Sequence, residues 1–309
     1  MSATAARLLT TAVPPSLVRV VPRVRPNVDG MSAPQLASFR QAFSGAMAVN
    51  DDRGFQHQAG IHGLPLPMYC THGSPLFLPW HRAYLYFFEL ALQDQVAGVS
   101  LPWWDWTSAA SHQHGLPAAY TDTANNNPLT GSPINPLAQQ QAPAEGIPHP
   151  PSHTTRQPSP SSDLPTSADV NAVLALGDFL DFSTQVEQIH NNVHVWVGGT
   201  MSEIPLAAYD PVFWAHHTMI DRLWRLWQLR HPTAGVPSGL MNEALPPFPM
   251  TVSQTLSVST LGYDYATAVA HIPIPFAKLA QATFVPVPGP DPGPEAAGGA
   301  QAVEGGAAQ

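Results

Sequence analysis

Six of the 14 histidines of this chain form two groups of three, and each group has the residue types and spacing of a metal site. In one group two histidines lie nine residues apart and a third lies ten residues earlier; in the other, two lie four residues apart and a third follows downstream. The four-residue spacing places both imidazoles on one face of a helix, within reach of one ion. The groups are His62, His72 and His81, and His190, His194 and His217.

His216 directly precedes His217, and only one of these two side chains can face the axis of a helix bundle. His217 lies four residues before Asp221 and seven before Trp224, so these three side chains share one helix face. We therefore take His217 as the ligand and expect His216 to point about 100° aside.

The residues beside the histidines favour copper over zinc or iron. A zinc-protease helix has a glutamate after its first histidine, whereas this chain has Asn191 there. Di-iron bundles take Glu-x-x-His pairs from two helices, and Glu187 with His190 supplies one pair only, because Glu89 has no histidine three residues later. The single cysteine, Cys70, excludes a Cys-rich zinc or iron–sulfur site. An all-imidazole ligand set suits copper best among the common metals.

The charge balance and the hydropathy pattern limit the partners. The chain has 12 lysine and arginine residues against 21 acidic ones, a formal net charge of −9, which argues against a nucleic-acid partner. No apolar run reaches the roughly 18 residues of a membrane span, so no membrane contact is predicted. Residues 1–28 contain four arginines and no acidic residue, which favours a basic arm over a secretion signal. We therefore expect a protein that is cytoplasmic or exported without a recognisable signal.

Proline, which occurs 35 times, is concentrated in two stretches that divide the chain. Residues 107–168 lack a sustained apolar period and read as a long excursion between core elements. Residues 285–309 are rich in Pro, Gly and Ala and are predicted to be disordered. With a flexible N-terminal arm at 1–23, this leaves one folded domain at 24–284, which includes the excursion.

Helix signals in the ordered part predict the elements that position the histidines. Ser32 caps a helix at 33–48, and Pro79 opens a second helix, apolar almost all round, that stops at Gly98. A third helix covers 184–197, and a fourth begins at Pro211 after the cap Asp210 and ends at His231. The expected fold is mainly α: a central four-helix bundle that holds the metal site, with long irregular loops and little β-structure.

Three segments resemble the tyrosinase and polyphenol oxidase family, the type-3 copper proteins that include molluscan hemocyanins. HGSPLFLPWHRAYLYFFE at 72–89 resembles the family's CuA signature, and DPVFWAHHTMID at 210–221 its CuB signature. HNNVHVWVGGTM at 190–201 is similar to the family's HN-x-x-H segment. Arg25 and the Tyr263-Asp264-Tyr265 motif resemble the start and the end of the family's core, so the resemblance covers about 24–275.

The resemblance implies roles for individual residues. The six histidines of the two groups would bind two copper ions, CuA and CuB, with His57 as a competitor of His62 for the first position. Cys70 would form a thioether with the ring of His72, which would fix that ring. Glu187 and Asn191 would hold and activate a water as the general base. The residues expected to border the site or to brace its ligands are Phe213, Trp196, Trp214, Asp221 and Arg222.

The resemblance also implies an activity: copper-dependent oxidation of o-diphenols to o-quinones with dioxygen as co-substrate, and ortho-hydroxylation of monophenols, as in tyrosinase. The expected partner is a small phenol, with a second copy of the chain or a copper-delivery protein as further partners. Three alternatives remain open at this point: a diphenol-only catechol oxidase, an o-aminophenol oxidase and a hemocyanin-like oxygen carrier. We favour the enzyme because residues beyond 285 do not resemble the domain that covers the hemocyanin site.

Overall fold

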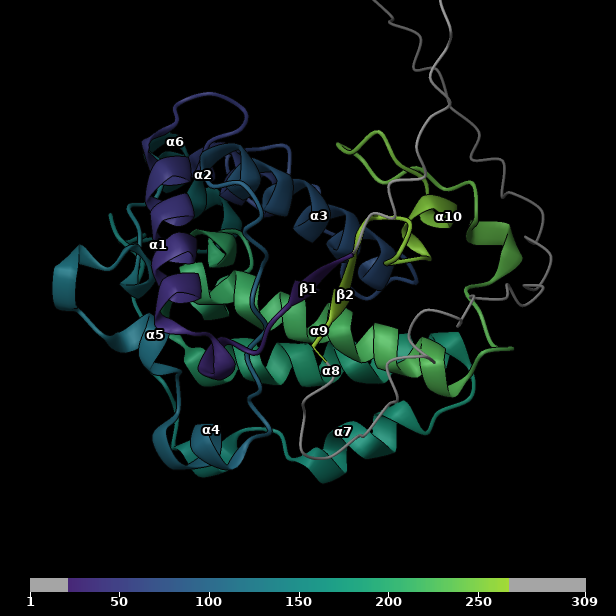
Figure 1. The fold of residues 1–309 in the computed structure, drawn as a ribbon. Helices are drawn as coiled ribbons and strands as arrows, with labels where there is room; N and C mark the ends of the chain where they lie inside the picture. Colours follow the sequence, from purple (N-terminus) through teal and green to yellow (C-terminus); the bar gives the residue numbers. More distant parts are fainter. Residues whose placement is uncertain (1–21, 267–309) are drawn as a thin grey trace, which may run out of the picture.

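The computed structural model describes residues 22–266, and the fold in this range is mainly helical (Figure 1). Most of the predicted arm, the whole predicted tail and His271 lie outside the described residues, so the boundaries at 24 and 284 stay a prediction. None of the described helices is long and apolar enough to cross a membrane. The longer elements are α1 (Ala33–Ala48), α2 (Phe55–His62), α3 (Phe77–Gln95), α7 (Ser167–Leu174), α8 (Phe179–Val197) and α9 (Pro211–Arg230).

Short elements connect these helices. The short α-helices are α4 (Ala109–His114), α5 (Ala118–Thr121), α6 (Pro136–Gln141) and α10 (Val252–Thr255). The strands are β1 (Arg23–Arg25) and β2 (Tyr263–Tyr265). The 3₁₀ helices are Val28–Gly30, Ala124–Asn126, Pro128–Thr130, Ala142–Glu145, Ser161–Asp163, Gly199–Ser202, Ala207–Tyr209 and Ser238–Leu240.

The predicted helix starts are confirmed where a cap defines them. The Ser32 side chain accepts a hydrogen bond from the Gln35 amide at the start of α1, and Asp210 caps α9 through the Val212 amide. The start predicted for the third helix was wrong, because α8 begins at Phe179 after a cap by Asp178. The start at Pro79 was also wrong: α3 begins at Phe77, and a proline is tolerated throughout the first turn, where amides have no intrahelical partner.

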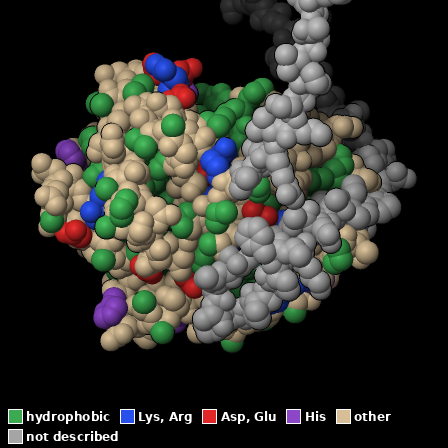
Figure 2. Space-filling view, in the orientation of Figure 1, with side chains coloured by type: hydrophobic (Ala, Val, Ile, Leu, Met, Phe, Trp, Pro, Cys, Tyr) green, Lys and Arg blue, Asp and Glu red, His purple; other side chains and the backbone are tan. Residues whose placement is uncertain are grey.

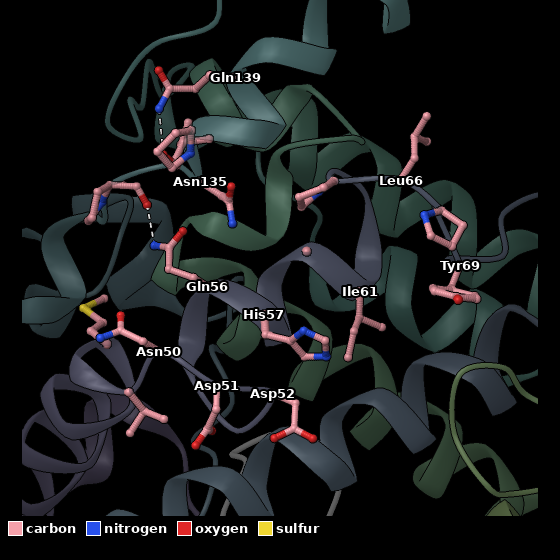
Figure 3. Close-up of a pocket in the computed structure, with 18 of the residues that line it drawn as sticks. Asn50, Asp51, Asp52, Gln56, His57, Ile61, Leu66, Tyr69, Asn135 and Gln139 are labelled. Atoms are coloured by element: carbon pink, nitrogen blue, oxygen red, sulfur yellow. Dashed lines mark hydrogen bonds between the residues drawn. The ribbon is translucent and has the colours of Figure 1, made fainter.

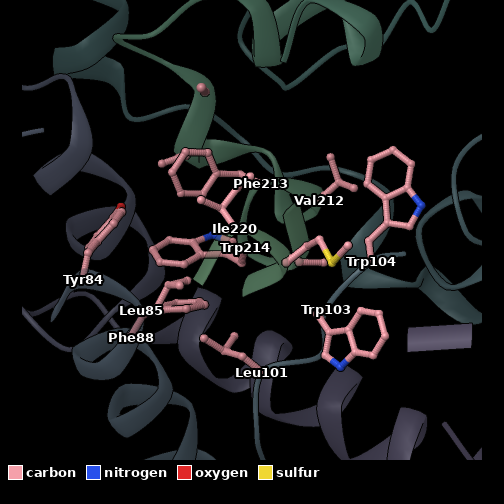
Figure 4. Packing of buried hydrophobic residues seen from close by; sticks show 14 of the residues in the cluster. Tyr84, Leu85, Phe88, Leu101, Trp103, Trp104, Val212, Phe213, Trp214 and Ile220 are labelled. Carbon is pink, nitrogen blue, oxygen red and sulfur yellow. The ribbon is translucent and has the colours of Figure 1, made fainter. Parts of the chain in front are cut away.

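Helix α9 lies at the centre of the fold and is buried along nearly its whole length. It packs against α3 and α8, and aromatic rings fill the space between them (Figure 4). The Trp214 ring on α9 stacks on Phe88 of α3 at a centroid distance of 3.6 Å. This close packing holds the backbones of the histidine-bearing helices in fixed positions.

Strands β1 and β2 join the two ends of the described chain beside α9 (Figure 1). They pair in parallel, with Arg23 opposite Tyr263 and Arg25 opposite Tyr265. Arg25 is fully buried and forms ion pairs with Glu89 of α3 and Asp221 of α9. The strand pair therefore anchors both ends of the described range, 22–266, to two of the central helices.

The excursion at 107–168 is folded against the core instead of extending from it. It contains α4, α5 and α6, and it buries Tyr120, Leu129 and Ile134. Arg156 in this segment pairs with the α9 cap Asp210, with 2.6 Å between Nη2 and Oδ1. The absence of a helical period in the sequence reflects short elements that pack individually on the helices beneath them.

The surface of the described part agrees with an acidic chain that has few charges. On the face drawn in Figure 2, the charged side chains that are visible are scattered singly or in small groups, with no continuous basic patch.

Candidate metal centre

Four helices and one loop bring the six predicted ligands together. His62 ends α2, His72 lies in the loop before α3, His81 is on α3, and α8 and α9 supply the others. Four of the six side chains are at most 3 % exposed, while His72 and His194 are partly exposed. The structure therefore places all six candidates in one cluster between α2, α3, α8 and α9.

The second histidine group converges on a point. The Nε2 atom of His217 lies 3.1 Å from the Nε2 atoms of both His190 and His194. Each of the two α8 rings is held by its other nitrogen: His194 Nδ1 lies 2.7 Å from the Met201 carbonyl oxygen, and His190 Nδ1 lies 2.9 Å from Asn191 Oδ1. Because a carbonyl oxygen can only accept, Nδ1 carries the proton and Nε2 keeps its lone pair for a metal.

The first group shows the same arrangement. His62 Nδ1 donates to the Ile204 carbonyl at 3.2 Å, and His81 Nδ1 donates to the Phe77 carbonyl at 2.8 Å. The Nε2 atoms of both rings are buried and have no hydrogen-bond partner in the described structure. The His72 ring centroid lies 5.5 Å from that of His62 and 5.3 Å from that of His81.

Burial keeps these imidazoles neutral. It lowers the pKa of His72 and of His194 to about 4, and it lowers the pKa of His62, His81, His190 and His217 well below the ordinary value. Neighbouring imidazoles add to this effect, since a second positive charge nearby is unfavourable. A neutral imidazole is the form that binds a metal.

These observations test whether two metal ions fit the cluster. A buried polar atom without a hydrogen-bond partner lowers the stability of a fold. Here such atoms include imidazole nitrogens of the cluster, and their lone pairs are directed toward ligand nitrogens of neighbouring histidines within 4.8 Å. The described donor set is imidazole with one nearby thiol and no carboxylate, which suits copper and disfavours magnesium, calcium or a di-iron centre. The cluster therefore has the donor set and protonation state of a dicopper site.

The expectation that His216 points away from the site was wrong. Its ring stacks on His190 at a centroid distance of 5.1 Å and lies 5.0 Å from His194. A ring nitrogen of His216 lies within 4.8 Å of the ligand atoms of the second group. Consecutive residues on α9 are rotated by about 100°, which does separate His216 from His217. Helix α8 nevertheless packs so closely on α9 that both rings reach α8.

A cavity of about 380 Å³ opens onto the histidine cluster. Its lining comes from α8, from the 3₁₀ helix at Gly199–Ser202 and from the loop around His72. Glu187 and Asn191 both face this cavity, and Glu187 Oε1 accepts a hydrogen bond of 2.6 Å from the Gly73 amide. Burial raises the pKa of the Glu187 carboxyl. No residue of the 107–168 excursion is part of this lining.

The aromatic residues expected around the site divide into two sets. The Phe213 ring stacks on the ring of His217 at a centroid distance of 3.9 Å, and its centroid lies 4.8 Å from that of His62. Phe213 therefore borders the metal centre. Trp214 packs on Phe88 in the core, and Trp196 donates from Nε1 to the Pro160 carbonyl. Neither tryptophan lines the cavity, so the expectation that they border the site was wrong.

Asp221 joins the elements that hold the ligands. Its carboxylate is the partner of Arg82, the neighbour of His81, and of Arg25 on β1. The hydroxyls of Tyr263 and Tyr265 also donate to it. The adjacent Arg222 instead lies over the Trp103 ring at 4.2 Å.

Cys70 lies beside the first group, as the Cys-x-His spacing predicts. Its Sγ atom and ligand nitrogens of His62 and His72 lie within 4.8 Å of one another. Cys70 is free and partly buried, and burial raises the pKa of its thiol to about 12. The placement allows a bond between the sulfur and the His72 ring, and whether it forms is part of the proposal below.

His57, the competitor of His62, faces a separate groove of about 1060 Å³ on the other side of α2 (Figure 3). Asp51, Asp52 and Asn135 also line this groove. A ring nitrogen of His62 lies within 4.8 Å of ligand nitrogens of His81 and His217, so the geometry favours His62 as the ligand.

The remaining described histidines lie outside the cluster. His114, His149 and His153 are exposed. His112 and His231 are partly buried. The Nε2 atom of His112 lies 3.2 Å from the Pro165 carbonyl oxygen, and the Nε2 atom of His231 lies 2.9 Å from the Leu174 carbonyl oxygen.

Sequence reasoning missed four contributors to the site. The carbonyl groups of Met201 and Ile204 orient two ligands, and a backbone group has no side-chain signal in a sequence. The backbone amide of Gly73, which donates a hydrogen bond to Glu187, likewise has no side-chain signal in the sequence. His216 could have been found from its position beside a ligand.

Comparisons with known proteins agree with this site. Residues 52–230 match the common central domain of tyrosinase. The chain is 34 % identical over 233 residues to the tyrosinase of Streptomyces antibioticus, covering 63 % of this chain and 80 % of that protein. It is 32 % identical over 240 residues to hemocyanin units G and H of Sepia officinalis, covering 71 % of this chain and 40 % of that protein. The chain thus spans less than half the length of that hemocyanin.

Solved structures of the same two kinds have this fold. A functional unit of octopus hemocyanin superposes with a TM-score of 0.70 at 28 % identity, covering 83 % of this chain and 71 % of that chain. Tyrosinase from Burkholderia thailandensis superposes with a TM-score of 0.63 at 23 % identity, covering 84 % and 76 % of the two chains.

Proposed function

This chain belongs to the tyrosinase family of type-3 copper proteins, and we propose that it is an enzyme that oxidises o-diphenols to o-quinones and hydroxylates monophenols at the ortho position, with dioxygen as co-substrate. The observation that supports this proposal most is the cavity that reaches the histidine cluster. Glu187 lines this cavity together with four of the six histidines, which supports a role for its carboxylate in taking the proton of a bound phenol.

The copper ions, when bound, supply the redox chemistry with dioxygen. His62, His72 and His81 would hold one ion, and His190, His194 and His217 the other. The backbone carbonyls at Nδ1 fix the tautomer and the orientation of the rings, so the Nε2 lone pairs are directed before metal enters. The chain therefore contributes a rigid, neutral ligand set.

Glu187 and Asn191 would handle the phenolic proton. The Gly73 amide occupies Oε1 of Glu187 and aims the carboxylate along the cavity, while Asn191 uses its oxygen for His190 and keeps its amide hydrogens free. A water held between the two side chains can pass the proton of the phenol to the carboxylate. The raised pKa of Glu187 makes it a stronger base than an exposed glutamate.

Cys70 would become part of the site by a covalent step. Its Sγ atom would form a bond to a carbon of the nearby His72 ring; the S–H and C–H hydrogens would leave as two protons, and dioxygen would take the two electrons, with bound copper supplying the redox chemistry. The bond would hold the partly exposed His72 ring in place, as hydrogen bonds at Nδ1 do for His62, His81, His190 and His194.

Glu187→Gln tests the assignment of the base, with Glu203→Gln as the matched control, because Glu203 is exposed and outside the cavity lining. The proposal predicts that Glu187→Gln loses monophenol hydroxylation by about a hundredfold or more. Oxidation of a diphenol should fall far less. Hydroxylation at the parental rate in Glu187→Gln contradicts the assignment.

The hemocyanin relatives support a second candidate, a reversible oxygen carrier. The two functions differ in turnover: a copper-loaded enzyme browns a catechol solution quickly, and an oxygen carrier shows an oxygen-dependent absorption band without consuming catechol.

A further inference from the structure

The cavity that opens onto the histidine cluster has an unusual charge composition. Apart from the histidines, Glu187 is the only ionisable residue in its lining, and no lysine or arginine of the described chain is part of it. The other lining residues are Gly73, Thr184, Gln188, Asn191, Val195, Met201, Ser202 and Ile204. Among the described side chains, a substrate in this cavity therefore meets one carboxylate and no lysine or arginine.

The described arginines are committed to partners elsewhere in the fold. Most pair with a carboxylate: Arg23 and Arg25 with Glu89, Arg40 with Asp122, Arg53 with Asp51, Arg82 with Asp221, Arg156 with Asp210 and Arg225 with Asp264. Arg222 lies over Trp103, and Arg230 donates to Asn171. None of these contacts involves a residue of the cavity lining.

Two apolar side chains are left open to solvent in the same lining. Val195 is 67 % exposed and directly follows His194 on α8, and Ile204 is 49 % exposed. Both lie on backbone that the metal ligands hold in place, because Ile204 accepts from His62 through its carbonyl. An apolar surface at the entrance to a polar site gains from contact with an apolar substituent.

We infer that this site selects phenols and catechols whose ring substituent is uncharged and apolar, and that it disfavours those that carry a carboxylate. This inference rests on the proposed function. With the phenol oxygen toward the metal, a carboxylate on the ring substituent gives up water without a lysine or arginine among the described lining residues, and it approaches the like charge of Glu187. An ester or alkyl group at the same position meets Val195 and Ile204 without either cost.

The test compares 3-(3,4-dihydroxyphenyl)propanoic acid with its methyl ester, which have the same ring and chain length and differ in charge. The copper-loaded protein should oxidise the ester with a kcat/KM about tenfold or more above that of the acid. Equal values, or a preference for the acid, overturn the inference.

Val195→Arg should restore oxidation of the acid, because the new guanidinium would lie near the carboxylate of the bound acid. We expect the acid-to-ester ratio of kcat/KM to rise about fivefold, the effect of one exposed ion pair. Val195→Gln is the matched control, with a long polar side chain and no charge, and its ratio should stay at the parental value. A similar rise in both variants contradicts the role of charge.

A binding measurement separates this inference from the proposed function. Calorimetry of the copper(I)-loaded protein without dioxygen, with 3-(3,4-dihydroxyphenyl)propanoic acid and with its methyl ester, reports the charge preference without turnover. If no catechol is oxidised when dioxygen is supplied but the ester binds more tightly than the acid, the proposed activity fails and the selectivity stands. If catechols are oxidised but the acid binds at least as tightly, the selectivity fails and the activity stands.

Discussion

The neutral histidine cluster should make the metal-free protein sensitive to acid, and His194 allows this effect to be worked out. An unfolded histidine binds a proton with a pKa of about 6.5, whereas burial lowers the pKa of His194 in the folded chain to about 4. Between these values the unfolded state binds more protons than the folded state. The contribution of His194 to stability is therefore complete above pH 6.5 and is lost as the pH falls toward 4.

The magnitude follows from the two pKa values. One proton of difference changes the free energy of unfolding by about 1.4 kcal/mol per pH unit. From pH 7 to pH 5, a pKa of 6.5 in the unfolded state and about 4 in the folded state give a loss of about 2 kcal/mol from His194 alone. The other buried histidines of the cluster add losses of the same sign.

The assay is urea unfolding of the chelator-treated protein at pH 7, 6 and 5. His194→Gln should lose about 2 kcal/mol less than the parent between pH 7 and pH 5, because glutamine does not titrate. His149→Gln is the control, since His149 is exposed in the excursion, and it should follow the parent. If His194→Gln and the parent lose the same stability, His194 is not held neutral and the argument fails.

Three further predictions concern the metal, the helix anchor and the crosslink. Copper at a thousand times its Kd should raise the free energy of unfolding by about 4 kcal/mol per site, visible as a Tm increase that a chelator reverses; a Tm independent of copper would contradict the metal site. Asp221→Asn should cost about 3–5 kcal/mol because it leaves Arg25 and Arg82 buried without their anion, whereas Asp163→Asn, at an exposed site, should cost less than about 0.5 kcal/mol. Intact mass of the copper-treated protein should lie 2 Da below the sequence mass, and Cys70→Ser should remove this difference; a thiol that titrates freely after denaturation would exclude the thioether.

Much of the fold was predictable because local signals agree with the tertiary structure. Ser32 and Asp210 set two helix starts, and the little β-structure expected is confirmed among the described residues. Helix α2 was missed because its sequence, FQHQAGIH, has no apolar period and includes a glycine. Its helical form depends on packing against α1 and the 3₁₀ helix at Ala207–Tyr209.

The site was predictable to the extent that side chains define it. The spacing of His190 and His194 is a local property of one helix, and the structure brings both to His217. The direction of His216 was not predictable, because it depends on how closely α8 packs on α9. The roles of Trp196 and Trp214 were misjudged for the same reason: an aromatic ring beside a ligand in sequence can point into the core.

The most direct test of the account is dioxygen uptake by the protein loaded with two copper ions per chain and supplied with catechol. The account predicts continuous consumption of dioxygen with a matching rise in o-quinone absorbance, both abolished when the copper is removed. Reversible binding of dioxygen at full copper occupancy, with no loss of catechol, would contradict the enzyme and identify an oxygen carrier.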